Sequence, residues 1–377
     1  GPVHEAFGKP VTFNPKPGLT IPQAPPAPVE ELPPEEKPEG DNVSWIPGYW
    51  SYDEERNDFI WVSGFWRSVP PERQWVPGYW NQTGNGHQWV SGYWAPAKVK
   101  EAEYLAPPPE SLEAGPSTQP PSQEHIWVPG CWIWHGTRYA WRPGYWIVAQ
   151  PGWIWVPAHY VWTPCGYVFC DGYWDYSLRR RGVLFAPVYI SRTVYTRPGF
   201  VYSPTIIIDG DVVTEHFFVR PAYGHYYFGD YYATSYVSVG ITPWFSFHYT
   251  RHCYDPVFAY YECHYRRVDP GWSVRIRADF TYRCNNIDAR PPRTFVAQQT
   301  VVNNINKTKI VENKTVIKNT NIQNNGNMVL AKNIKDVAKD KDAPVKFEKV
   351  AQDKRQELGK QAKEVRQAAD QRVKLES

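Results

Sequence analysis

Large aromatic residues recur at short, regular intervals between residues 45 and 174, and short polar stretches separate them. The recurring pattern is Trp-x-x-Gly-x-Trp, set among Val, Ile and Tyr, which favour pleated strands. Turn-forming sequences rich in Gly, Pro and Asn fall between the copies, at residues 83–86, 135–136, 150–152 and 163–166. The pattern therefore predicts one strand for each copy, with turns between copies.

The chain holds eight copies of this motif in two blocks of four. Successive copies begin 14 residues apart, except for a first step of 16, and 38 residues separate the fourth copy from the fifth. Because 14 and 16 are even numbers, the alternation of strand faces is preserved within each block. The complete copies are Trp45-Gly48-Trp50, Trp61-Gly64-Trp66, Trp75-Gly78-Trp80, Trp89-Gly92-Trp94, Trp127-Gly130-Trp132 and Trp141-Gly144-Trp146; the degenerate copies are Trp155-Ala158-Tyr160 and Phe169-Gly172-Trp174.

The spacing also predicts a strand register. A turn centred within residues 135–136 places Gly130 opposite Trp141 and Trp127 opposite Gly144. Each indole would then cover the bare backbone of a neighbouring glycine, an arrangement known as aromatic rescue. The same match at every 14-residue step predicts an all-β fold with two four-stranded antiparallel aromatic meanders.

A β-turn at the motif itself is the alternative, because Pro-Gly fits the centre of a type II turn. Three copies instead carry Ser63, Ser91 or Asp171 before the glycine, and good turn sequences already lie between the copies. Proline cannot donate to a strand ladder. We therefore favour a bulge at the Pro-Gly step.

Composition divides the rest of the chain. The Pro-rich segments are expected to be extended, either as plain linkers or as partner-binding straps. Within the Tyr-rich region, Asp209-Gly210 predicts the tip of a hairpin over residues 206–213. The Asn/Thr-rich segment is either disordered or adds strands to a neighbouring subunit. The expected segments are a Pro-rich acidic arm (1–43), the first repeat block (44–96), a Pro-rich linker (97–124), the second repeat block (125–177), a Tyr-rich β region (178–296), an Asn/Thr-rich extended segment (297–331) and a charged helical tail (332–377).

Charge and motif content argue against several functions. The net charge of +3 gives no basic field for nucleic acid, and no apolar run is long enough for a membrane-spanning helix. No nucleotide-binding, nucleophile-elbow or zinc-protease motif is present. We therefore expect no catalytic residues, no cofactor and no resident metal.

The six cysteines are an even number, which in an exported protein favours disulfides. The preferred local pairs are Cys253–Cys263 and Cys165–Cys170. A metal site that adds His252 and His264 to the first pair is the alternative. In a hairpin, however, successive side chains point to opposite faces, so the cysteines would meet on one face and the histidines on the other.

The repeat resembles the WxxGxW (also written YxWGxW) family of bacterial envelope-associated proteins. The string Pro-Pro-Glu-Glu-Lys-Pro-Glu-Gly-Asp-Asn at residues 33–42 looks like the long, multi-copy members of that group. The resemblance implies a secreted or cell-envelope location and no settled activity. The start at Gly1-Pro2 fits removal of a signal peptide or a tag-cleavage scar equally well.

These observations together predict a structural envelope or extracellular protein. Aromatic sheets and terminal arms would hold it in a homo-oligomer or against other envelope proteins. The alternative is a carbohydrate- or peptidoglycan-binding module, because exposed Trp and Tyr faces match the apolar faces of sugars.

Overall fold

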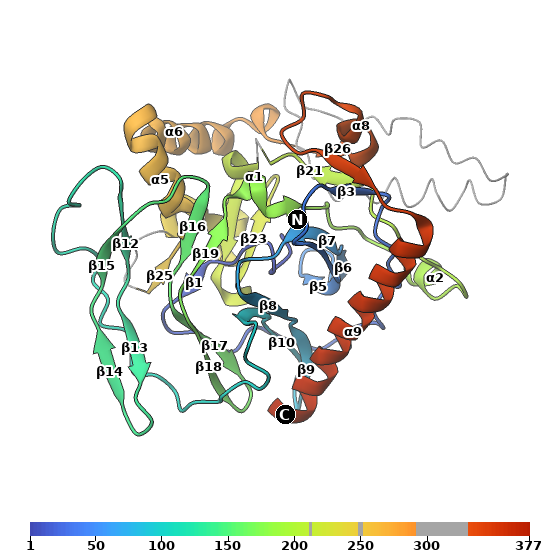
Figure 1. The fold of residues 1–377 in the computed structure, drawn as a ribbon, viewed down its shortest axis with the longest axis horizontal. Helices are drawn as coiled ribbons and strands as arrows, with labels where there is room; N and C mark the ends of the chain where they lie inside the picture. The colour runs from blue at the N-terminus through green and yellow to red at the C-terminus, as the bar shows by residue number, and fades with distance from the viewer. Residues whose placement is uncertain (211–212, 248–251, 292–330) are drawn as a thin grey trace.

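The computed structural model describes residues 1–210, 213–247, 252–291 and 331–377. The eight motif copies pair into four two-stranded antiparallel ribbons, and each ribbon contains two consecutive copies (Figure 1). Ribbon 1 contains β4 (Val43–Ile46), β5 (Tyr49–Asp53), β6 (Asp58–Val62) and β7 (Phe65–Ser68); ribbon 2 contains β8 (Arg73–Val76), β9 (Tyr79–Thr83), β10 (Gly86–Val90) and β11 (Tyr93–Pro96); ribbon 3 contains β12 (His125–Val128), β13 (Cys131–Trp134), β14 (Tyr139–Arg142) and β15 (Tyr145–Val148); ribbon 4 contains β16 (Trp153–Val156), β17 (His159–Thr163), β18 (Gly166–Cys170) and β19 (Tyr173–Tyr176).

This pairing confirms the strand-rich character and corrects the predicted meanders. Each copy is hydrogen-bonded to one other copy only, so the second and third copies of a block do not pair with each other. The register is also shifted by two residues from the expected one: Trp132 lies opposite Trp141, and Trp127 lies opposite Trp146. Cross-strand pairing of indoles sets the register, and their ring centroids lie 5.3 Å apart in both pairs.

Both strands of every ribbon are interrupted at the motif glycine. In ribbon 1, Ile46 pairs with Phe65 before the interruption and Tyr49 pairs with Val62 after it, so the register continues unchanged. Two residues are skipped on each strand, and neither strand carries an extra one. The Pro-Gly step is therefore neither a bulge nor a chain reversal, and we call this interruption the ribbon centre.

The indoles cover the glycines diagonally, as aromatic rescue requires. A Cβ at Gly92 would lie 2.5 Å from the Trp75 ring, and a Cβ at Gly172 would lie 2.5 Å from the Trp155 ring. Any side chain there would displace the indole. The single exception supports the rule, because Ala158 belongs to the ribbon in which Phe169 replaces the covering Trp.

The region after the repeats is mixed rather than all-β. It contains α1 (Leu178–Arg181), β20 (Gly182–Val183), α2 (Arg192–Tyr195), β21 (Ile206–Ile208), β22 (Phe217–Arg220), β23 (His225–Phe228), α3 (Thr234–Ser238), β24 (Thr242–Pro243), α4 (Trp244–Phe247), β25 (Cys253–Tyr254), α5 (Pro256–Val268) and α6 (Trp272–Asn285), with short 3₁₀ turns at Val213–His216, Pro221–Tyr223 and Ile287–Ala289.

Two predictions for this region are wrong: that it is β-structured throughout, and that residues 206–213 form a hairpin. Helix α5 starts at Pro256 because the Asp255 carboxylate accepts the Phe258 N–H, a strong helix-start signal. Strand β21 pairs with β26 (Ala331–Asn333) on one edge and with residues 184–186 on the other. It therefore has no open edge for the hairpin predicted over residues 206–213, of which residues 211–212 lie outside the described part of the chain. The Asn/Thr-rich segment lies outside the described residues apart from its last position, Ala331.

Both terminal parts of the chain pack against the repeats (Figure 1). The acidic arm contributes β1 (Val11–Thr12), β2 (Thr20–Ile21) and β3 (Glu36–Pro38), and its Val3 and Ala6 are fully buried. The tail contains α8 (Ile334–Lys339), β27 (Phe347–Lys349), which pairs with β3, and α9 (Gln352–Glu376), which contacts ribbons 1 and 2. The arm is therefore part of the core and not a plain linker.

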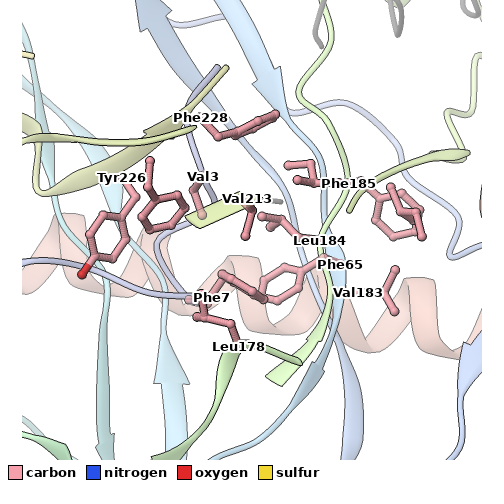
Figure 2. Close-up of a cluster of buried hydrophobic side chains, with 14 of the residues drawn as sticks. Val3, Phe7, Phe65, Leu178, Val183, Leu184, Phe185, Val213, Tyr226 and Phe228 are labelled. Atoms are coloured by element: carbon pink, nitrogen blue, oxygen red, sulfur yellow. The ribbon is translucent and has the colours of Figure 1, made fainter. Parts of the chain in front are cut away.

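The main core gathers side chains from distant segments. Figure 2 shows Val3 and Phe7 of the arm beside Phe65 of ribbon 1, Leu178 of α1 and Phe185. A buried ion cluster borders it: Asp175 of ribbon 4 binds Arg67 of ribbon 1 at 2.6 Å and Arg181 of α1 at 3.3 Å. These two arginines also donate to the backbone carbonyls of the arm at Ala6 and Phe7.

The cysteines do not form the predicted pairs. No disulfide joins any of the six, and Cys263 lies in helix α5, so the hairpin that would bring it to Cys253 is absent. The buried thiol of Cys170 has a pKa raised to about 12, chiefly by burial, which keeps it protonated. Among the described residues, none of the helices is both long enough and apolar enough to cross a membrane.

We expect the substitution Asp175→Asn to lower the free energy of unfolding by about 3–5 kcal/mol, because it leaves two buried guanidinium groups without a counter-charge. Denaturant unfolding followed by tryptophan fluorescence measures this. Glu124→Gln is the matched control, because its ion pair with Arg267 is more than half exposed, and its effect should stay below about 1 kcal/mol. Equal effects of the two substitutions would contradict a structural role for the buried cluster.

Candidate functional site: carboxylates in the ribbon centres

The ribbon centres contain backbone groups that the ladder does not pair. The strands stop on either side of the glycines, so the glycine N–H groups have no partner within the ribbon. A buried backbone N–H without an acceptor is costly, and native structures nearly always supply one. Where the residue before the glycine is proline, it brings no second N–H to satisfy.

Glu31 supplies the acceptor in ribbon 1. Its buried carboxylate accepts from the backbone N–H of Gly48 at 3.2 Å and of Gly64 at 3.0 Å. It also accepts from the indole N–H of Trp61 at 2.6 Å. One glutamate of the acidic arm therefore satisfies both central glycines and one indole.

Glu5 holds the equivalent place in ribbon 2, where it meets one indole and one of the two central glycines. One carboxylate oxygen accepts from Trp89 Nε1 at 2.5 Å, and the other accepts from Gly92 N at 2.7 Å. The backbone N–H of Glu5 donates to the Tyr49 hydroxyl of ribbon 1. This glutamate therefore also links the first two ribbons.

Glu113 occupies ribbon 3 and comes from the Pro-rich linker. Its carboxylate accepts from Trp127 Nε1 at 3.1 Å and from Gly130 N. The backbone of the linker holds it in place, because the Glu113 N–H donates to Ser111 Oγ and the carboxylate also accepts from Gly115 N. The side chain is 6% exposed.

The three sites share one geometry. The indole N–H of the first Trp and the backbone N–H of the Gly three residues later bind the same carboxylate, in the pairs Trp61/Gly64, Trp89/Gly92 and Trp127/Gly130. We call this pair of donors the Trp–Gly clamp. The Trp-x-x-Gly half of the motif therefore has a chemical meaning: it is a two-donor receptor for a carboxylate.

Basic or ring-nitrogen groups meet the carbonyls of the ribbon centres. Arg372 of α9 donates to Pro77 O at 2.8 Å and to Ser91 O at 3.1 Å, and Lys9 donates to Gly92 O. A His4 ring nitrogen lies 3.0 Å from Pro47 O in ribbon 1. In ribbons 1 and 2, an acid thus accepts from donors of the centre and a nitrogen donor faces carbonyls of the centre.

Ribbon 4 departs from this pattern. Its Gly172 N–H donates to the neighbouring Asp171 side chain at 3.0 Å, and Phe169 has no indole N–H. Trp155 is the first residue of the other motif copy in this ribbon. Its indole Nε1 is buried and, among the described residues, has no hydrogen-bond partner. Among the described residues, no glutamate is hydrogen-bonded to this centre.

Burial shifts the pKa of several groups in and around the centres. It raises the pKa of Glu31 to about 7, and burial likewise raises that of Asp255, the cap of α5, to about 7. Burial also lowers the pKa of four histidines. The pKa falls to about 3 for His4 and His216 and to about 4 for His159, and that of His225 is lowered as well.

The predicted repeat residues all take part in the ribbons, but the three glutamates were not predicted. Glu5 and Glu31 each end a Pro-Val-x-Glu string, whereas Glu113 follows Glu-Ser-Leu, so no one sequence is common to all three. The available signal was indirect, because a Pro-Gly step inside a strand leaves an N–H that needs an acceptor. Within the described residues, no three His, Cys, Asp or Glu side chains form a cluster that could hold a metal ion.

The fold and these sites define a class: a repeat protein of two-stranded aromatic ribbons whose centres bind carboxylates. The sequence model of the WXXGXW repeat (2 copies) matches residues 40–67, 75–95, 125–146 and 151–175, and each match is one ribbon. These four ranges therefore carry the WXXGXW repeat, which confirms the resemblance of the motif to that repeat family. No curated protein and no solved structure matches the chain.

We expect Glu31→Ala to lower the free energy of unfolding by about 2–4 kcal/mol, because three buried donors lose their acceptor. Glu30→Ala is the matched control one residue away, because Glu30 is exposed and its carboxylate pairs with the exposed Lys363. That substitution should cost less than about 0.5 kcal/mol. Denaturant titrations of the two variants decide the matter, and equal stabilities would refute the clamp in ribbon 1.

The pKa shifts predict that acid destabilises the protein. Below about pH 6.5 the four histidines take up protons in the unfolded chain and stay neutral in the folded one. Three acids with a raised pKa, Glu31, Asp255 and Glu262, act in the opposite direction, because the folded chain holds their protons at a higher pH than the unfolded chain does. Four groups outweigh three, so the free energy of unfolding should fall from pH 6.5 to pH 4.5. Urea titrations at these pH values test the sign, and a flat profile would contradict it.

Proposed function

We propose that this protein is a non-catalytic structural protein of the cell envelope or extracellular space that assembles with further copies of itself. Its ribbons serve as platforms that capture extended, glutamate-bearing segments. The observation that carries this proposal is the capture of Glu5, Glu31 and Glu113 by three equivalent clamps.

The captured segments favour assembly because they are separate from the ribbons that hold them. Glu5 and Glu31 lie in the acidic arm and Glu113 lies in the linker, 17 to 87 residues from the glycines that they contact. The contact is a side chain seated on a preformed centre. The same contact can form between two chains when a segment of one copy seats on a ribbon of another, as in domain swapping.

The tail gives a second contact of this kind. The Glu376 carboxylate at the end of α9 accepts from the Tyr79 hydroxyl at 2.7 Å and from the Tyr104 hydroxyl at 2.9 Å. The Arg372 guanidinium lies over the rings of Tyr79 and Tyr93. Both ends of the described chain thus dock on ribbon 2 through buried charged groups.

A carbohydrate-binding function is the second candidate, and ribbon 3 favours it. Its Trp132, Trp134, Tyr139 and Trp141 are half-buried and its Tyr145 is 39% exposed, unlike the buried indoles of ribbon 1. Exposed rings of this kind match the apolar faces of sugars. Ribbon 3 carries its own occupied clamp, so a glycan would use its rings and not its centre.

Mass photometry of the intact protein tests the proposal. We expect species at multiples of the 43.7 kDa chain mass, with the multimer fraction rising with concentration. Titration with soluble peptidoglycan fragments, followed by tryptophan fluorescence, should give no saturable change. A strictly monomeric protein that shows saturable quenching by glycans would reverse the ranking of the two functions.

A further inference from the structure

The centre of ribbon 4 has the architecture of the three occupied clamps but no glutamate. Its strands keep the same register across the interruption, with Val156 opposite Tyr173 and His159 opposite Cys170. Trp155 covers Gly172, and Trp155 and Trp174 pack edge to face with ring centroids 5.1 Å apart. The ribbon is therefore folded as a receptor before any carboxylate is present.

Two donors line this centre. Among the described residues, no group accepts a hydrogen bond from the buried Trp155 Nε1, and the backbone N–H of Ala158 stands three residues later, where the occupied clamps have glycine. The Trp45 indole N–H of ribbon 1 also lacks a partner, but Glu31 already fills that centre. Only in ribbon 4 does an unpartnered first-position indole, among the described residues, coincide with a centre that has no glutamate.

The charges around ribbon 4 suit an incoming anion. Arg73 donates to Gly172 O at 3.2 Å through Nη2, and its buried Nη1 has no hydrogen-bond partner. Arg180 lies over the rings of Trp153 and Tyr176. Two carboxylates of ribbon 4 lie nearby, but Asp171 is exposed and held by Gly172, and Asp175 is already paired with Arg67 and Arg181. The guanidinium groups of Arg73 and Arg180 are therefore not neutralised by either acid.

We propose that the centre of ribbon 4 receives a glutamate side chain from an extended Pro-rich segment of a second copy of this chain. Trp155 Nε1 and the Ala158 N–H donate to its carboxylate, as Trp89 and Gly92 do to Glu5. The chain carries suitable glutamates in such segments: Glu110 is exposed and follows Pro109, and the exposed Glu30, which pairs with the exposed Lys363, lies between Pro28 and Pro33. This inference rests on the proposed self-association and names the site through which it occurs.

Peptide binding to the full-length protein tests the site directly. The probe is a fluorescent peptide of residues 26–35, Pro-Ala-Pro-Val-Glu-Glu-Leu-Pro-Pro-Glu, with an all-glutamine version as its control. We expect saturable binding in fluorescence polarisation, and at least tenfold weaker binding of the glutamine peptide. No binding of the glutamate peptide to the wild-type protein would overturn the proposal.

Two substitutions at one position separate the hydrogen bond from the packing. Trp155→Phe removes the N–H but also shrinks the ring, so it risks disturbing the ribbon. Replacement of Trp155 by benzothienylalanine keeps the bicyclic ring and exchanges only the N–H for sulfur. Both should weaken peptide binding at least tenfold, whereas Trp134→Phe, in β13 of ribbon 3, should leave it within twofold. Unchanged binding to the benzothienylalanine protein would overturn the proposal.

Mass photometry of the same proteins distinguishes this inference from the broader function. We expect the benzothienylalanine protein to lose the multimers that the wild type forms. Multimers that persist in this variant would leave the scaffold function standing and overturn ribbon 4 as its contact. A wild-type protein that stays monomeric would overturn both the self-association and the second copy as the occupant.

Discussion

The structure depends on one constraint. When both strands of a ribbon are interrupted at the same place, backbone N–H groups are left in the interior without partners in the ladder. The glycines at these interruptions are needed because indoles lie where a side chain would be. The same close packing excludes water, so only a protein group can accept from the glycine N–H. A buried carboxylate meets two or three donors at once, and those hydrogen bonds offset part of its cost of burial. Aromatic packing and acid capture are thus two results of one geometry.

The glutamates also decide how the four ribbons are held together. Two-stranded ribbons are marginal by themselves, and they need further contacts to persist in water. Here the acidic arm runs from ribbon 2 to ribbon 1 through Glu5 and Glu31, and the linker is fixed to ribbon 3 through Glu113. Asp175 joins ribbon 4 to ribbon 1 through Arg67. Acidic groups at each junction therefore do what extended strand pairing does in an ordinary sheet.

The motif spacing was enough to predict strands, turn positions and glycines covered by indoles. It was not enough to fix the strand register. The observed register pairs Trp132 with Trp141, and the expected one placed Gly130 opposite Trp141. The two registers differ by only two residues, so every side chain keeps the same face in both. Helix α5 was missed because its Tyr-rich composition resembles that of strands. Helix α6 was missed because Trp272, Val274 and Ile276 alternate with polar residues, as in a strand. The glutamates could not be identified because the acceptor of an unpaired N–H can lie anywhere in the chain. Long-range partners of this kind need not share one local pattern.

Ribbon 4 shows how a repeat of this design can diverge. Ala158 adds a methyl group at a centre where the other matched copies tolerate none, and Phe169 provides the smaller ring that makes room for it. Either change alone would create a clash or a void, so the two positions are coupled although they lie on different copies. Drift in this family should consequently proceed by compensated pairs across a ribbon, and a copy that appears degenerate by itself can belong to a well-packed whole.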